Sequence, residues 1–196
     1  MARLPELDPA EADPRVRQAL ERLPQLAIFR TVANAQGSFV SWLRFGADCL
    51  DARWFDPVLR ELAILRVARL TPGAHYEWAQ HVPILLAVGG TREQVDALER
   101  DDTEHEALGE DGRLVVAFTT QVVRDATPDD ATFAAMSSRF TSAEITQLLL
   151  VIGQYMMVGR VMATAQLEVD AVLGDEVLAG IEGGANPIPP EDAGQR

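Results

Sequence analysis

Apolar residues recur at intervals of three and four through most of this chain, the spacing that places them on one face of an α-helix. No segment sustains the alternation of apolar and polar positions that marks a half-buried strand. The helical pattern extends over residues 8–23, 38–50, 56–70, 74–88, 91–100, 112–124, 128–140 and 141–172. We therefore expect an all-α fold, a single-domain bundle of about seven to nine helices.

The helices between residues 55 and 100 place ionisable groups among apolar ones. Glu61 lies on the apolar face of the first, and Glu77 and His81 stand one turn apart on the second. The turn at 71–73, Thr-Pro-Gly, is short, so these two helices should run antiparallel with their apolar faces in contact. Burying ionisable groups separately is costly. We therefore expect the three to converge in one partly buried, ligand-accessible pocket suited to proton transfer.

Other side chains in this stretch are secondary candidates. Tyr76 and Gln80 share another face of the second helix, where they could donate hydrogen bonds to a substrate oxygen or seal an interface. Trp78 is expected to form core or pocket wall, and with those two it completes the candidate substrate-binding set. Arg66 departs from the apolar face of its helix, so we expect it to pair with a carboxylate elsewhere.

Composition narrows the classes of function. A net charge of −13 disfavours a nucleic-acid partner or an anionic membrane surface. The one cysteine, Cys49, allows no intrachain disulfide and is expected to pack as a small apolar residue. The N-terminus lacks a signal-peptide pattern, so we expect a cytoplasmic protein. A Glu-x-x-x-His pair with Glu61 as a third ligand could hold a metal, but no repeated Glu-x-x-His motif supports it. We expect no metal and no cofactor.

The helical pattern at 141–172 is apolar on nearly every side. Such a helix is either buried all round or lies in an interface, and we expect it to be covered by another subunit. Gln154, Tyr155 and Arg160 interrupt the apolar run and argue against a membrane span. The tail at 181–196 is rich in Gly and Pro, and we expect it to be flexible.

Three consecutive runs together resemble the carboxymuconolactone decarboxylase family, which is related to the alkylhydroperoxidase D proteins. They are Arg60-Glu61-Leu62-Ala63-Ile64-Leu65-Arg66-Val67-Ala68, then Tyr76-Glu77-Trp78-Ala79-Gln80-His81, then Gly89-Gly90-Thr91-Arg92-Glu93-Gln94-Val95. The resemblance implies an alkylhydroperoxidase D-like helical bundle and a homo-oligomer, as a dimer, trimer or hexamer. It also implies a site with a Glu on the first helix and a His on the second. The peroxidase branch has a Cys-x-x-Cys pair before that His. Ala74 and Glu77 occupy those two places here.

The resemblance divides the chain into an N-terminal helical extension (1–37), a helical domain like that of the family (38–180) and the tail (181–196). It implies a cofactor-independent enzyme acting on a small carboxylated or carbonyl substrate, like a lactone decarboxylase, with His81, Glu61 and Glu77 as catalytic residues. Two alternatives stay open: a peroxidase-like antioxidant, disfavoured by the missing thiol pair, and a non-catalytic oligomeric ligand-binding protein.

Overall fold

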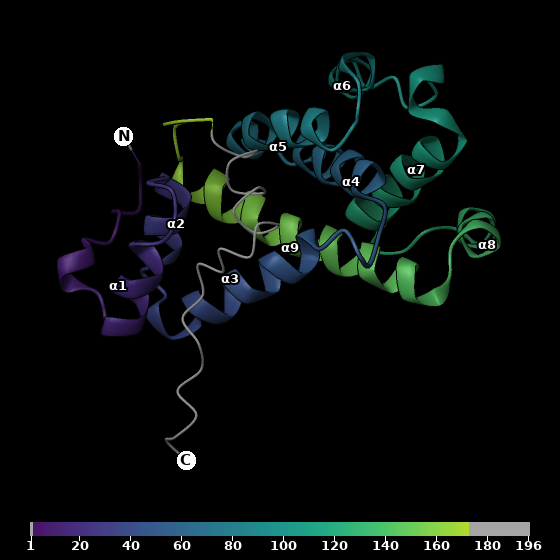
Figure 1. Ribbon diagram of the computed structural model, residues 1–196. Helices are drawn as coiled ribbons and strands as arrows, with labels where there is room; N and C mark the ends of the chain where they lie inside the picture. The colour runs from purple at the N-terminus through teal and green to yellow at the C-terminus, as the bar shows by residue number, and fades with distance from the viewer. Residues whose placement is uncertain (1, 173–196) are drawn as a thin grey trace.

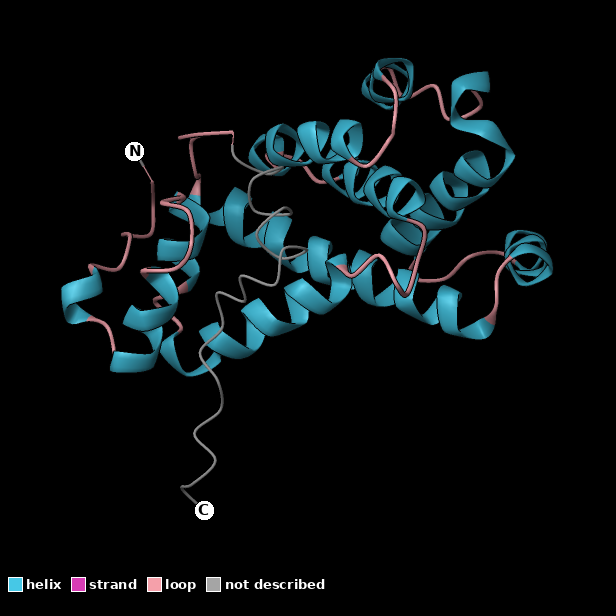
Figure 2. Ribbon diagram, viewed as in Figure 1, coloured by secondary structure: helices cyan, strands magenta, loops and turns pink. Residues whose placement is uncertain are grey.

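The computed structural model of the chain describes residues 2–172. Every regular element within them is helical (Figure 2), which confirms the all-α prediction. These residues form the α-helices α1 (Pro14–Leu20), α2 (Ala27–Val32), α3 (Gln36–Leu50), α4 (Pro57–Leu70), α5 (His75–Ala87), α6 (Arg92–Glu99), α7 (Gly109–Asp125), α8 (Asp130–Arg139) and α9 (Ser142–Ala165). Two short 3₁₀ helices, η1 (Pro9–Glu11) and η2 (Glu106–Leu108), complete the set.

Helix α4 is the centre of the fold. It packs against α5, α6, α7 and α9, and every side chain from Arg60 to Ala68 is buried (Figure 1). The helix begins where the sequence predicts, because the Asp56 side chain accepts a hydrogen bond of 2.9 Å from the backbone N–H of Leu59. Helices α1 and α2 lie at one end of the molecule, and α6, α7 and α8 at the other (Figure 1).

The structure pairs α5 with α9 in a regular antiparallel register. The rings of His81 and Tyr155 face each other, and one turn toward the start of α5 the carboxyl group of Glu77 faces Gly159. A further turn back, a Cβ at Gly73 would lie 3.3 Å from the Cβ of Ala163. Each turn toward the N-terminus, from His81 to Glu77 and then to Gly73, therefore corresponds to one turn toward the C-terminus of α9. The small residues Gly159 and Ala163 on α9 allow the close approaches to Glu77 and Gly73.

The last helix is shorter than predicted. It ends at Ala165, and Gln166 has a left-handed φ of 53°, whereas the sequence pattern suggests a helix to 172. The segment after it turns back across the molecule, where Leu167 is buried and the Asp170 carboxylate accepts hydrogen bonds from the Ala27 backbone N–H and the Tyr76 hydroxyl. These tertiary contacts replace the helical hydrogen bonds that residues 167–172 would otherwise make.

Helix α9 is buried on one side only within the single chain. Leu149, Leu150 and Met157 are 40%, 46% and 46% exposed, while Leu148, Val151 and Ile152 belong to the core. Among the described residues, α9 is the one helix long and apolar enough to cross a membrane. Half of its most apolar window is buried inside the molecule.

Two further predictions are modified by the structure. The predicted helix at 8–23 divides into η1 and α1, with Ala12 and Asp13 between them. The residues at 101–111 precede the predicted helix at 112–124, but they contain η2 and the first turn of α7. The predicted tail at 181–196 lies outside the described residues, and the boundary expected after residue 37 falls just inside α3.

Candidate active site

Glu61 and His81 meet in the interior, between α4 and α5. The Nδ1 atom of His81 lies 2.7 Å from Oε2 of Glu61, and the two residues are 7% and 0% exposed. A carboxylate accepts hydrogen bonds and does not donate them, so this contact places the hydrogen of a neutral imidazole on Nδ1. The Nε2 lone pair is then the free, basic end of the ring. The contact is the geometry expected of a general acid–base pair.

Arg60 anchors the other end of the same carboxylate. Its Nε donates to Oε1 of Glu61 over 2.9 Å, and its Nη1 donates to the carbonyl oxygen of Leu50 over 2.5 Å. Arg60 is 1% exposed. A helical wheel places Arg60 on the polar side of α4, away from Glu61, and therefore predicts that Arg60 is exposed. That prediction is wrong, because Arg60 is buried. Since α4 has neighbours on every side, its polar positions are buried as well.

Glu77 is the unusual group of the site. It is 1% exposed, and neither carboxyl oxygen has a hydrogen-bond partner among the described residues. Burial alone raises the pKa of Glu77 well above its usual value, which favours the neutral carboxylic acid over the carboxylate. Both carboxyl oxygens are shielded from solvent in the single chain. The Nη2 atom of Arg60 is a second buried, unpartnered donor in this part of the molecule.

Tyr155 of α9 is a site residue that sequence reasoning did not find. Its ring meets that of His81 edge to face, with centroids 4.7 Å apart and an interplanar angle of 88°. Burial, followed by the charges of Glu61 and Glu77, raises its pKa well above the usual tyrosine value. Tyr155 therefore remains a neutral phenol that fixes the plane of the imidazole. The sequence pointed to Tyr155 only as a polar aromatic residue in an otherwise apolar helix.

The candidate substrate-binding residues lie elsewhere. The hydroxyl of Tyr76 donates to Oδ1 of Asp170 over 2.9 Å, and burial, reinforced by this bond, raises its pKa. The side-chain amide of Gln80 donates to the carbonyl oxygen of Ala171. Trp78 packs against the apolar cluster between α4, α5 and α6. Tyr76 and Gln80 thus hold the segment after α9 against α5, and Trp78 lies beside the core.

Cys49 is buried at the end of α3. Burial, together with the charge of Asp48, raises the pKa of its thiol to about 11, so the group is protonated at neutral pH. It packs in the core cluster with Phe55 and Tyr155, as expected of a small apolar residue. Within the described residues, no group of three or more His, Cys, Asp or Glu is placed to hold a metal ion.

The contact between Glu61 on α4 and His81 on α5 is also the arrangement that the family resemblance implies. Residues 39–108 match the model of the Carboxymuconolactone decarboxylase family. The match covers less than half of the chain. The matched segment begins in α3, contains α4, α5 and α6, and therefore includes Glu61, Glu77 and His81. Comparison with curated proteins and with solved structures gives no significant match. The predicted resemblance is confirmed.

Proposed function

We propose that this protein of the carboxymuconolactone decarboxylase type is a cofactor-independent lyase, acting by proton transfer on a small carboxylated or carbonyl substrate. The observation that carries the proposal is the 2.7 Å contact between His81 Nδ1 and a Glu61 carboxylate already anchored by Arg60. A carboxylate so placed stabilises an imidazolium and orients its Nε2–H. His81 can then both give and accept a proton at one fixed atom.

In a decarboxylation, the bond between the substrate carbon and its carboxylate breaks. The electron pair stays on the carbon as an enolate conjugated with the neighbouring carbonyl, and CO₂ leaves. Protonated His81 gives its Nε2 proton to that carbon and returns to the neutral Nδ1–H form. Solvent restores the proton. Glu77, held neutral by burial, would donate a hydrogen bond to the oxygen on which the enolate charge develops.

The alternatives receive less support from the site. A thiol peroxidase needs a reactive thiolate, whereas the pKa of Cys49 is raised to about 11 and the residue is 2% exposed. We further propose that the protein acts in the cytoplasm as a homo-oligomer. The exposed apolar side of α9 supports the assembly.

The proposal is tested with γ-carboxymuconolactone and with simpler carboxylated γ-lactones. CO₂ release and deuterium uptake from D₂O at the carbon beside the carbonyl are followed by NMR. His81→Gln should lower the rate by about 10²- to 10⁴-fold, the usual contribution of a general acid or base. His75→Gln is the matched control, because His75 is exposed on the same helix. A His81→Gln protein that folds and keeps more than about a tenth of the rate would contradict the mechanism. A wild-type protein inert toward every probe would favour the ligand-binding alternative.

A further inference from the structure

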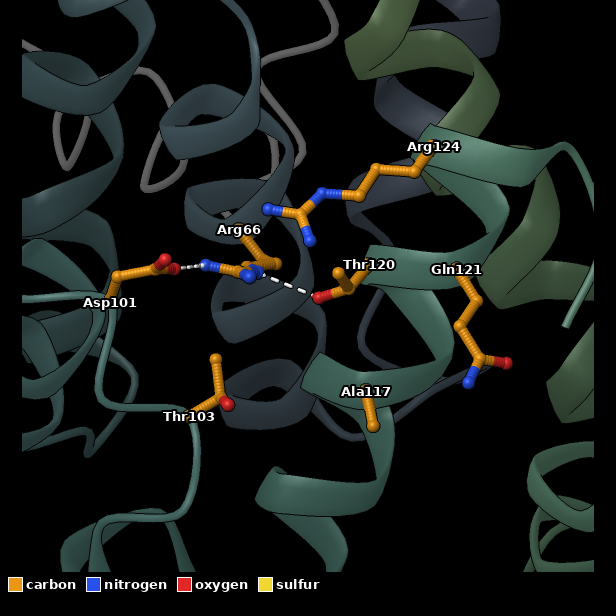
Figure 3. Close-up of a pocket in the computed structure, with 7 residues that line it drawn as sticks. All are labelled: Arg66, Asp101, Thr103, Ala117, Thr120, Gln121 and Arg124. Atoms are coloured by element: carbon orange, nitrogen blue, oxygen red, sulfur yellow. Dashed lines mark hydrogen bonds and ion pairs between the residues drawn. The ribbon is translucent and has the colours of Figure 1, made fainter.

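A second polar site lies on a different face of α4 from the candidate active site. Glu61 and Arg66 are five residues apart, which corresponds to about 140° around a helix. Arg66 points toward α7 and the turn after α6, where a pocket of about 300 Å³ opens (Figure 3). The pocket is lined by Arg66, Asp101, Thr103, Ala117, Thr120, Gln121 and Arg124. The proposed proton-transfer chemistry uses none of these residues.

The guanidinium group of Arg66 is held in a fixed position in this pocket. Its Nε donates to Oγ1 of Thr120 over 2.7 Å, and its Nη1 forms an ion pair with Asp101. The Thr120 hydroxyl is itself oriented by donating to the carbonyl oxygen of Val116 over 2.6 Å. The Arg66 side chain is only 3% exposed, so its orientation is set before any ligand arrives. Its predicted pairing with a carboxylate is confirmed.

Arg124 adds a second positive charge that is not neutralised. It is exposed near the end of α7, and it forms no hydrogen bond or ion pair within residues 2–172. Figure 3 shows its side chain extending toward Arg66. The hydrogen bond from Arg66 lowers the pKa of Asp101 most, and the charges of Arg66, Arg69 and Arg124 lower it further. Two guanidinium groups and one carboxylate line the pocket, so its lining has an excess of positive charge.

We infer that this pocket binds the oxyanion group, phosphate or carboxylate, of a small molecule between Arg124 and Arg66. Guanidinium groups bind such groups through paired, charge-assisted hydrogen bonds. Since Asp101 already neutralises one charge, a ligand with one oxyanion group fits the pocket better than a polyanion. The volume of about 300 Å³ is at the small end of sites for small molecules. The net charge of −13 does not prevent binding, because salt screens charges beyond about 8–10 Å.

Isothermal titration calorimetry of the full chain with phenyl phosphate and with benzoate tests the inference. Ionic strength is held constant with NaCl, and benzyl alcohol serves as the neutral analogue. The two anions distinguish a phosphate site from a carboxylate site. We expect at least one anion to bind and the alcohol not to bind. Arg124→Gln removes the free charge without disturbing a contact of the fold, and should weaken binding about tenfold, the loss expected for one charge-assisted hydrogen bond.

Arg113→Gln is the matched control. Arg113 lies on the same helix, and 11 residues correspond to about three turns, so it shares the side of α7 with Arg124 about 16 Å away. This variant should bind within about twofold of the wild type, since screening weakens the charge over that distance. Three results would overturn the inference: neither anion binds the wild type, Arg124→Gln binds as tightly as the wild type, or Arg113→Gln loses as much affinity.

Discussion

Glu77 and Gly159 face each other across the α5–α9 interface so closely that a Cβ at position 159 would lie 2.9 Å from Oε2 of Glu77. The same Cβ would lie 3.4 Å from Cγ2 of Thr71 and 3.6 Å from the Cβ of Ala74. Real Cβ atoms do not approach an oxygen so closely, so the buried carboxyl group would have to move. Glycine at 159 is therefore what allows an unpaired acid to lie between the two helices.

Gly159→Ala should destabilise the protein by about 1–3 kcal/mol, the usual cost of overpacking a tight interior. Gly37→Ala is the control, since Gly37 lies on α3 with nothing within 4 Å of the added Cβ. That substitution should stabilise the protein by about 0.5–1 kcal/mol, the difference in helix preference between glycine and alanine. Urea unfolding measures both. Stabilisation by both substitutions would show that the interface is looser than described.

Glu77→Gln should change how stability depends on pH. The pKa of Glu77 is raised above its ordinary value of 4.5 in the folded protein, so the unfolded chain loses the proton first as pH rises. The contribution of Glu77 to stability is complete below pH 4.5 and is lost as pH rises toward the folded pKa. This loss amounts to about 1.4 kcal/mol for each pH unit over which only the unfolded state is ionised.

Urea unfolding at several pH values above 4.5 checks this dependence. The Gln variant should lack the downward slope and exceed the wild type in stability at the higher values. Glu93→Gln, at an exposed position in the first turn of α6, should keep the wild-type slope. An unchanged slope in Glu77→Gln would mean that the carboxyl group is solvated or paired in solution.

Glu61→Gln should cost about 3 kcal/mol or more in the free energy of unfolding, because it leaves the buried charge of Arg60 without a counterion. Arg60→Met combined with Glu61→Gln should lose less than the sum of the single changes, with a coupling of about 1 kcal/mol or more. Denaturant unfolding of the four proteins completes the cycle. Arg139→Gln breaks an exposed pair with Asp111, each side chain nearly half exposed, and should cost less than about 1 kcal/mol. Additive losses at positions 60 and 61 would contradict the ion pair.

The exposed side of α9 should lie between subunits. Leu149, Leu150 and Met157 leave an apolar surface on one long helix, and burial between subunits removes it from water. Sedimentation equilibrium at micromolar concentration should give an oligomer, and Leu150→Glu should shift it toward the monomer. Phe133→Glu, at a residue of α8 that is 50% exposed, should not. A monomeric wild-type protein would refute this prediction.

Local chemistry predicted much of the fold. The Asp56 N-cap of α4 and the capping boxes of Thr91 with Gln94 and of Thr141 with Glu144 are each formed by residues close together in the sequence. These signals depend on neighbours in the sequence and so can be read from it. The pairing of α4 with α5 followed from the short turn between them, which is why the Glu61–His81 contact was predictable.

Contacts between segments that are distant in the sequence were harder to predict from it. Tyr155 reaches His81 only because α9 packs against α5 in one register, and no local pattern fixes that register. Arg60 was placed on a polar face because a helical wheel assumes that one side meets water. The end of α9 was misplaced since the apolar spacing continues past Ala165, while the contacts of Asp170 favour a different path.

The position of Asp170 has a consequence for the order in which the chain assembles. Its carboxylate accepts hydrogen bonds from the Ala27 backbone N–H, over 2.6 Å, and from the Tyr76 hydroxyl, although these groups lie 143 and 94 residues away along the chain. Closing loops of that size requires most of the chain to be in place, whereas the α4–α5 hairpin forms from near neighbours. Asp170 therefore joins the two ends of the described chain late in folding. The hydrogen bonds of Asp170 should also be among the first to open in the native protein. Their opening would expose the amide hydrogens of α2 to exchange before those of α4.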